Sequence, residues 1–223
     1  REGIPLGPER PIPPGLASMQ FTEEMKGFVG FGSSDPRTGV HAGRDAGSAL
    51  MFHLTMHIDG VNRFVVDPDH EARATGWVHC EALGGRLPAA GTFNLLVQEG
   101  DDPGSRQMLY RVFFHDSAGH ALTLAGVKYV HDNRGLDLWR DTTTLYTRVL
   151  RGHVAAEDEK DAEVVAAGVL RLGVADLARQ LSTFRATGPT MRDRADALRR
   201  FGQLFLGKVW DVYAQGVLSS SPF

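Results

Sequence analysis

The sequence predicts a mainly β protein, in which an antiparallel β-barrel follows a Pro-rich N-terminal arm and precedes two C-terminal α-helices. Residues 49–58 alternate strictly between apolar and polar side chains, which is typical of a β-strand with one buried face. Eight strand-like runs follow one another through short turns, and apolar residues then recur at helical spacing. These observations divide the chain into an arm (1–19), a barrel (20–173) and two amphipathic helices packed on the barrel (174–215).

The arm is predicted from its prolines, which fix φ, remove backbone donors and favour an extended chain. They are Pro5, Pro8, Pro11, Pro13 and Pro14. A first strand is expected over 20–31. Residues 32–47 mix Gly, Asp, Ser and Pro without periodicity, so we expect a long loop that could cover a barrel mouth.

The remaining strands follow the strand at 49–58. Asp67 followed by Pro68 suits a helix start, so a short helical turn is expected over 67–72. Further strands are predicted at 75–82, 92–99, 107–115, 121–130, 141–150 and 163–172. Residues 117–120 form a tight hairpin between two of them. Short turns imply an antiparallel meander, and eight strands match a closed barrel, calycin-like in shape.

Two amphipathic helices are predicted from apolar residues at helical spacing. The first helix carries Val174, Leu177, Leu181 and Phe184, and the second carries Leu198, Phe201, Phe205, Val209 and Val212. Thr190 with Asp193 three residues later resembles an N-capping arrangement for the second helix. The apolar faces need a partner, which is the barrel or, alternatively, a second copy of the chain in a homodimer.

Composition excludes several classes of protein. At 223 residues and a net charge of −3 the chain offers no room for a second catalytic domain and no basic surface for nucleic acid. A single cysteine, Cys80, excludes an internal disulfide and a Cys-rich metal site. No transmembrane run is present, and the Arg, Ala, Gly and Val bias indicates a high-GC bacterial genome. We expect a soluble protein, either cytoplasmic or exported after processing, since the chain starts at Arg1.

Histidines on the polar face of two strands are the first candidates for chemistry. His53 and His57 lie on one face of a strand, but their Cα atoms would be roughly 13 Å apart, too far to chelate one metal ion. They belong to a half-solvated face or line a ligand site. Trp77, His79 and Glu81 share a parity, so the carboxylate could orient the imidazole as a general base is oriented, or both could be solvated.

The candidate ligand-binding residues are the His and Tyr side chains of the strand-like runs, together with one tryptophan. They are His53, His57, His79, Tyr110, Tyr129, Trp139 and Tyr146. The sequence leaves open which strand face lines the lumen. Gly30 and Gly32 do not open a helix, so a dinucleotide loop is excluded, and no catalytic, cofactor or metal motif is present.

Residues 128–146 are the densest constellation of charged and aromatic residues, and 136–146 within it is predicted to be a structural corner. Arg140 between Asp137 and Asp141 is predicted to hold a structural corner beneath Trp139, because one guanidinium can satisfy two carboxylates. The alternative is that Trp139 closes a site for a flat apolar ligand.

Several short runs resemble an accessory region of bacterial cholesterol-oxidase-like GMC oxidoreductases. They are residues 21–27 (Phe-Thr-Glu-Glu-Met-Lys-Gly), 67–70, 75–76, 93–95, Met108, Tyr110-Arg111 and 135–146. The likeness covers about residues 20–215. It implies an association with the oxidation of sterols or other lipophilic alcohols. The chain lacks the family's flavin-binding G-x-G-x-x-G helix, so no flavin site and no catalytic residue is carried over.

Two hypotheses of function follow. The first is a non-catalytic accessory barrel that binds a lipophilic, sterol-like small molecule or docks to an oxidoreductase domain. The second is a barrel isomerase or cyclase that acts on an apolar substrate by His/Tyr acid–base chemistry, which needs only a dry cavity and one proton-transfer group. No cofactor is expected in either case.

Overall fold

The computed structural model describes residues 17–100, 105–131, 142–173, 176, 179–180 and 182–206. Residues 1–16 of the predicted Pro-rich arm lie outside these ranges, and its last residues, from Ala17 onward, are described. Also outside these ranges are Trp139 with the corner around Arg140, three of the four apolar residues of the first C-terminal helix (Val174, Leu177 and Leu181), and the end of the second helix.

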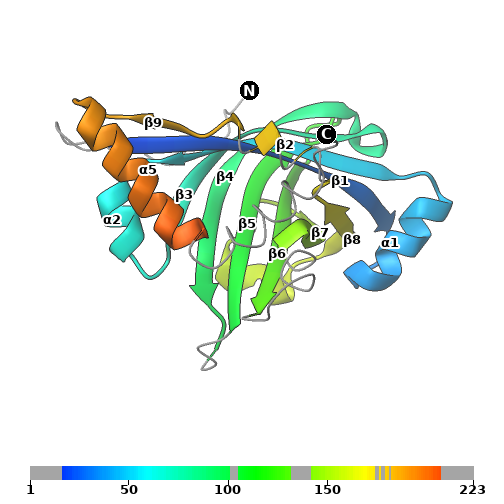
Figure 1. Ribbon diagram of the computed structural model, residues 1–223. Coiled ribbons are helices and arrows are strands. Elements are labelled where there is room, and N and C mark those ends of the chain that lie inside the picture. The colour runs from blue at the N-terminus through cyan, green and yellow to red at the C-terminus, as the bar shows by residue number, and fades with distance from the viewer. Residues whose placement is uncertain are drawn as a thin grey trace, which may run out of the picture.

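Nine strands and a few short helices make up the described chain (Figure 1). The strands are β1 (Ser18–Phe31), β2 (Ala49–Ile58), β3 (Glu71–Cys80), β4 (Gly85–Gln98), β5 (Ser105–His115), β6 (Ala121–His131), β7 (Thr144–Arg151), β8 (Val164–Arg171) and β9 (Arg185–Thr187). The α-helices are α1 (Pro36–Asp45), α2 (Val61–Val66) and α5 (Met191–Leu206), and the 3-10 helices are η1 (Glu81–Leu83) and η2 (Ala156–Asp161). None of the helices in this part of the chain is long and apolar enough to cross a bilayer.

The first eight strands form a closed antiparallel barrel, as predicted. Consecutive strands pair from β2 to β8, and β1 closes the ring by pairing with both β2 and β8. Glycines allow the strands to coil tightly. A Cβ on Gly76 of β3 would lie 1.9 Å from the His53 carbonyl oxygen, and one on Gly91 of β4 would lie 2.0 Å from the Arg111 carbonyl oxygen.

The apolar parity of each strand faces the barrel interior. On β2 the side chains of Leu50, Phe52, Leu54, Met56 and Ile58 are all buried, whereas those of the opposite parity are partly exposed. Residues from all eight strands belong to one continuous core cluster. The outward face of β2 is therefore the one that carries His53 and His57.

Helix α1 replaces the loop expected over residues 32–47. Asp35 caps the helix by accepting hydrogen bonds from the N–H groups of Arg37 (2.9 Å) and Thr38 (3.0 Å), and the hydrogen bond from Thr38 lowers the pKa of its carboxyl. Gly39 and Gly43 let α1 lie directly on β8 and β1, because a Cβ on Gly39 would be 2.1 Å from the Ala167 carbonyl oxygen. Gly39 and Gly43, which favoured a loop in the sequence, form the face of α1 that packs closely against the barrel.

The prediction of a helical turn over residues 67–72 is also wrong. The short helix α2 lies earlier, at Val61–Val66, and Glu71 already belongs to β3. Asp67 instead accepts a hydrogen bond from the Asp69 N–H (3.0 Å) in a turn. The Asp–Pro pair therefore signals a turn here and not a helix start.

Helix α5 covers one end of the barrel, beside α2 (Figure 1). Its start is capped as predicted: Asp193 N–H donates to Thr190 Oγ1 and Thr190 N–H donates to Asp193 Oδ2, both at 3.1 Å. Phe201 and Phe205 pack against Phe21 of β1 and against Phe184. The second predicted helix thus buries Phe201 and Phe205 on the barrel, whereas Leu198 is exposed, and Val209 and Val212 lie outside the described residues.

Strand β9 was not predicted. Its three residues pair with Ser18–Gln20 at the start of β1 and extend the sheet beyond the ring. A three-residue strand is too short to show an alternating pattern, which explains why sequence periodicity does not reveal it.

Candidate functional site

The predicted histidine candidates lie on the outer face of β2 and β3, and none of them lines either of the two pockets found among the described residues. His53 Nδ1 is 3.3 Å from Glu24 Oε2, and its ring stacks on Trp77 with centroids 5.3 Å apart. His79 Nε2 is 3.1 Å from Glu81 Oε1, so the predicted His–carboxylate contact forms, on an exposed surface. The contacts of His53 join β2 to β1 and β3, whereas the contact of His79 with Glu81 is local.

His57 is held on the same outer face. Its Nε2 lies 2.9 Å from Thr75 Oγ1 on the neighbouring strand. Partial burial lowers the pKa of the His57 imidazole, and the positive charge of Arg73 lowers it further. Neutral His57 is therefore favoured in the folded chain. Among the described residues, no three His, Cys, Asp or Glu side chains gather closely enough to hold a metal ion.

Tyr110 points the other way, into the barrel, where it meets a buried ion pair. Its hydroxyl donates to Glu23 Oε2 at 2.6 Å, and Lys128 Nζ donates to Glu23 Oε1 at 2.5 Å. The side chains of Glu23 and Lys128 are each 2% exposed. Sequence reasoning named Tyr110 but missed its two charged neighbours. Both occupy positions of apolar parity, Glu23 between Phe21 and Met25, and that break in the pattern is the signal that could have found them.

The space beside this ion pair is small. It measures about 10 Å³, enough for roughly one water molecule, and its walls include Phe21, Phe93 and Phe205. Gln180 also lines it, and its buried Oε1 accepts no hydrogen bond. Among the described residues, the space that borders the Glu23–Lys128 pair is therefore too small for a ligand much larger than water.

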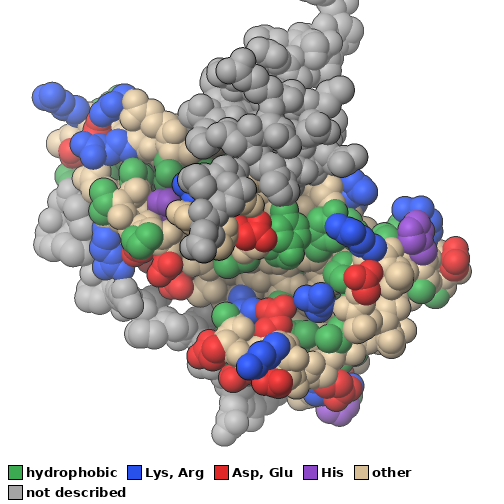
Figure 2. All heavy atoms as spheres, turned by 90° about the horizontal axis from the view of Figure 1, so that it is seen from below, with side chains coloured by type: hydrophobic (Ala, Val, Ile, Leu, Met, Phe, Trp, Pro, Cys, Tyr) green, Lys and Arg blue, Asp and Glu red, His purple; other side chains and the backbone are tan. Residues whose placement is uncertain are grey.

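A much larger space lies on the outside of the barrel, across the outer faces of β4 to β7. We call it the outer groove, and its volume is about 690 Å³. Seen from below, the molecule is hollowed here, and hydrophobic as well as acidic and basic side chains gather around the hollow (Figure 2). Side chains that line it include Thr92, Asn94, Val97, Gln107, Leu109, Arg111, Ala125, Val127, Tyr129, Tyr146, Arg148 and Glu159.

The strand register arranges these side chains in rows. Thr92, Arg111, Ala125 and Arg148 lie opposite one another on the four strands. The next row is Asn94, Leu109, Val127 and Tyr146. A third row places Val97, Gln107 and Tyr129 together. Because residues two apart on a strand share a face, all three rows look into the outer groove.

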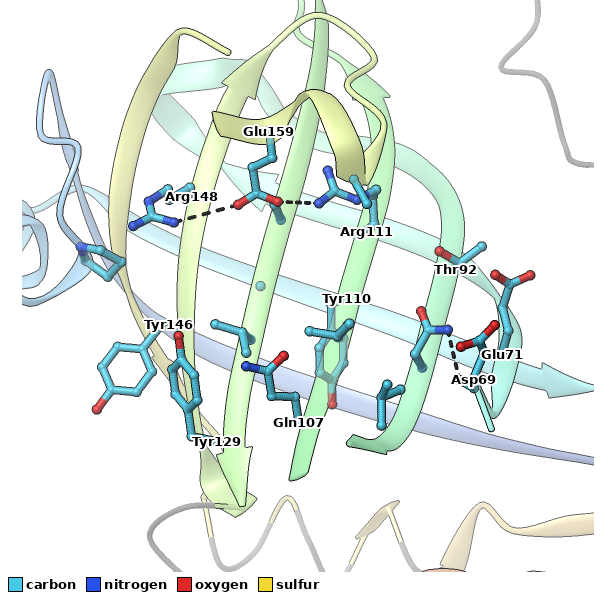
Figure 3. A pocket seen from close by; sticks show the side chains of 18 of the residues that line it. Asp69, Glu71, Thr92, Gln107, Tyr110, Arg111, Tyr129, Tyr146, Arg148 and Glu159 are labelled. Carbon is cyan, nitrogen blue, oxygen red and sulfur yellow. Dashed lines mark hydrogen bonds and ion pairs between the residues drawn. The ribbon is translucent and has the colours of Figure 1, made fainter. Parts of the chain in front are cut away.

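One side of the outer groove carries an ion-pair cluster and another carries two tyrosines (Figure 3). Glu159 of η2 pairs with Arg111 Nη2 and lies 3.7 Å from Arg148 Nη1. The rings of Tyr129 and Tyr146 have centroids 5.8 Å apart, and the guanidinium of Arg37 lies 5.7 Å from the Tyr146 ring centroid. The outer groove therefore brings together two of the predicted residues, Tyr129 and Tyr146. Sequence reasoning missed Arg111, Arg148 and Glu159.

Comparison with family models, curated proteins and solved structures finds no match for this chain. The chemistry of the site therefore has to be argued from its own geometry. The outer groove combines apolar side chains, Leu109 and Val127 among them, with many polar and charged groups, and its acidic residues are Asp35, Asp69, Glu71 and Glu159.

Proposed function

We propose that this chain is a non-catalytic binding barrel that holds a lipophilic small molecule in the outer groove. The observation that carries the proposal is the apolar floor, where Leu109, Val127 and Tyr146 lie side by side on three neighbouring strands. The volume of about 690 Å³ falls within the roughly 300–1,000 Å³ of small-molecule sites. A ligand on this floor would gain about 25 cal/mol for each Å² of apolar surface that it removes from water.

The barrel interior supports a ligand less well than the outer groove does. Its space beside Glu23 and Lys128 is about 10 Å³, whereas a sterol-sized molecule needs hundreds of Å³. A container in the usual sense would require the aromatic side chains at this end to move away. We therefore place the lipophilic ligand on the outside of the barrel.

The resemblance to an accessory region of cholesterol-oxidase-like GMC oxidoreductases supports a narrower proposal. It favours a sterol-like alcohol, or a product of its oxidation, as the ligand class. It also favours an oxidoreductase domain as the partner. The barrel would deliver the ligand to this domain or receive the ligand from it.

Binding of a soluble steroid alcohol tests the proposal. We expect dehydroepiandrosterone to bind the wild-type chain in isothermal titration calorimetry. Val127→Lys places a charge in the middle of the apolar floor and should abolish the binding signal. Val66→Lys is the matched control, because Val66 is 77% exposed on α2, outside the outer groove, and should bind as the wild type does. A wild-type chain that binds no steroid, or a Val127→Lys variant that binds normally, would contradict the proposal.

The catalytic alternative finds less support in the geometry. An isomerase or cyclase needs its proton-transfer groups around one cavity. The histidines lie on the outer face of β2 and β3, and Tyr110 is hydrogen-bonded to Glu23 inside the barrel. Tyr129 and Tyr146 line the outer groove, and Tyr110 lines it too but directs its hydroxyl to Glu23, so binding is the function that the geometry supports best.

A further inference from the structure

The 3-10 helix η2 rests against the outer groove through one carboxylate. None of its six residues is buried. Glu159 is half-buried and pairs with side chains of the strands, whereas the other five residues are exposed. η2 contributes no buried side chain of its own, whereas Val154 and Ala162 on either side of it pack against Ala125 and Leu150. Within η2, Glu159 makes the contact with the strands through its pairing with Arg111 and Arg148.

Those two arginines form a built anion site. Arg111 of β5 and Arg148 of β7 both lie opposite Ala125 of β6, so two guanidinium groups flank one small side chain. Neighbouring strands are about 4.8 Å apart, which puts the two arginine Cα atoms about 10 Å apart with room for a carboxylate between their heads. That room is where Glu159 extends in Figure 3.

Both guanidinium groups are also anchored by backbone oxygens. Arg111 Nη1 donates to the Val154 carbonyl oxygen at 3.0 Å, and Arg148 Nε donates to the Ser34 carbonyl oxygen at 3.1 Å. These bonds hold the heads in place and leave further N–H donors for a carboxylate. Preorganised arginines of this kind bind carboxylates through charge-assisted hydrogen bonds.

The anion site continues directly into the apolar floor. The row that contains Leu109, Val127 and Tyr146 lies two residues along the strands from the arginine row, a distance of about 7 Å. The row with Tyr129 lies about 7 Å further on. A ligand with an anionic head between the arginines would thus lay an apolar body of about 13 Å over the floor.

We propose that Arg111 and Arg148 bind the carboxylate of an amphipathic acid, such as a fatty or steroid acid, and that Glu159 occupies this position until the ligand displaces it. The inference rests on the proposed function and names the ligand class of the same outer groove. The ligand carboxylate takes over the hydrogen bonds of Glu159, and its apolar body covers Leu109 and Val127. Glu159 is then released from the two arginines, while Val154 and Ala162 keep both ends of η2 beside the barrel.

Decanoate and decanol are matched probes, because they share an apolar chain and differ in the charged head. We expect isothermal titration calorimetry at pH 7 to show tighter binding of decanoate than of decanol. Glu159→Gln removes the competing carboxylate and should raise the decanoate affinity about fivefold while leaving decanol unchanged. Glu157→Gln removes the same charge from an exposed position of η2 and is the control for a general charge effect.

Removing a cation should have the opposite effect. Arg148 is 43% exposed, so Arg148→Gln is expected to fold, and it should weaken decanoate binding without changing decanol binding. Added salt should weaken the binding of decanoate alone, because screening acts on the charged head. Should both probes bind equally, with Glu159→Gln and Arg148→Gln altering neither, the carboxylate site is overturned and the outer groove remains a binding site. If neither probe binds the wild type or any variant, both the carboxylate site and the proposed function are overturned.

Discussion

His57 is a side chain whose charge state depends on folding. It lies half-buried on β2, where its Nε2 contacts Thr75 Oγ1. Burial lowers the pKa of its imidazole below the ordinary value of 6.5, and Arg73 adds to the shift. Below that value the unfolded chain binds a proton at this position more readily than the folded chain does. Stability should therefore be lost as the pH falls from 6.5 through the folded-state pKa.

The substitution His57→Gln should flatten this pH dependence, because glutamine does not titrate. We expect urea denaturation to show that the wild type loses more free energy of unfolding than His57→Gln between pH 7.5 and pH 5.5. His41→Gln, on the exposed face of α1, serves as the control and should keep the wild-type slope. Equal slopes for all three chains would show that His57 titrates alike in the folded and unfolded states.

Glu23 and Lys128 illustrate what a side-chain pattern can and cannot reveal. Alternation on β2 correctly divides an apolar from a polar face, and the apolar face proves to be the inner one. The same rule assigns charged residues to the outside, yet Glu23 and Lys128 lie inside because each neutralises the other across the barrel. Their partnership joins residues 105 positions apart in the sequence, which no local pattern encodes.

The Glu23–Lys128 ion pair joins strands β1 and β6. The loss in the free energy of unfolding should depend on whether one charge or both charges are removed. Lys128→Met leaves the Glu23 carboxylate buried beside Tyr110 without its cation, which should cost about 3–5 kcal/mol. The double variant Glu23→Gln, Lys128→Met removes both charges and keeps an oxygen that can accept from the Tyr110 hydroxyl. It should regain much of that loss.

Urea denaturation of the two single variants and the double variant measures this coupling. The wild type completes the double-mutant cycle and fixes the reference free energy of unfolding. If the double variant lost as much stability as the sum of the two single variants, the two charges would be independent, and the pair would not explain their burial.

The elements differ in how well the sequence predicts them. The range of β2 is predicted to the residue because its apolar parity is unbroken, and β6 and β8 are predicted to within one residue at each end. Helix α1 is missed because its contact face is made of Gly39 and Gly43, which carry no apolar signal. Asp35 followed by Pro36 was the available sign of a helix start.

The barrel was predictable, whereas the outer groove was not. Short turns between strands allow few topologies other than a meander, and eight strands close on themselves as β1 does with β2 and β8. The outer groove depends instead on the register that aligns Arg111 with Arg148. It also depends on η2, which folds back over that row. Register is fixed by packing of the complete barrel, so it emerges only in the structure.

The closed ring predicts that the barrel opens as one unit. Residues of all eight strands share a single core cluster, and Cys80 at the end of β3 belongs to it with 0% exposure. Burial also raises the pKa of the Cys80 thiol, which lowers the fraction of reactive thiolate. We expect 5,5′-dithiobis-(2-nitrobenzoic acid) to leave Cys80 unmodified in the native chain and to react with it as urea unfolds the protein.

The variant Cys80→Ala, Asn62→Cys supplies the comparison, because position 62 is exposed on α2 and its thiol should react at once. If the barrel opens only as a whole, the reaction rate of Cys80 should rise with urea in parallel with the loss of secondary structure, since both then report the same equilibrium. A Cys80 thiol that reacts in native buffer nearly as fast as the thiol at position 62 would show that β3 separates from its neighbours by itself. Closure through β1 argues against this, because freeing β3 breaks its pairing with both β2 and β4 and exposes the apolar side chains that fill the barrel.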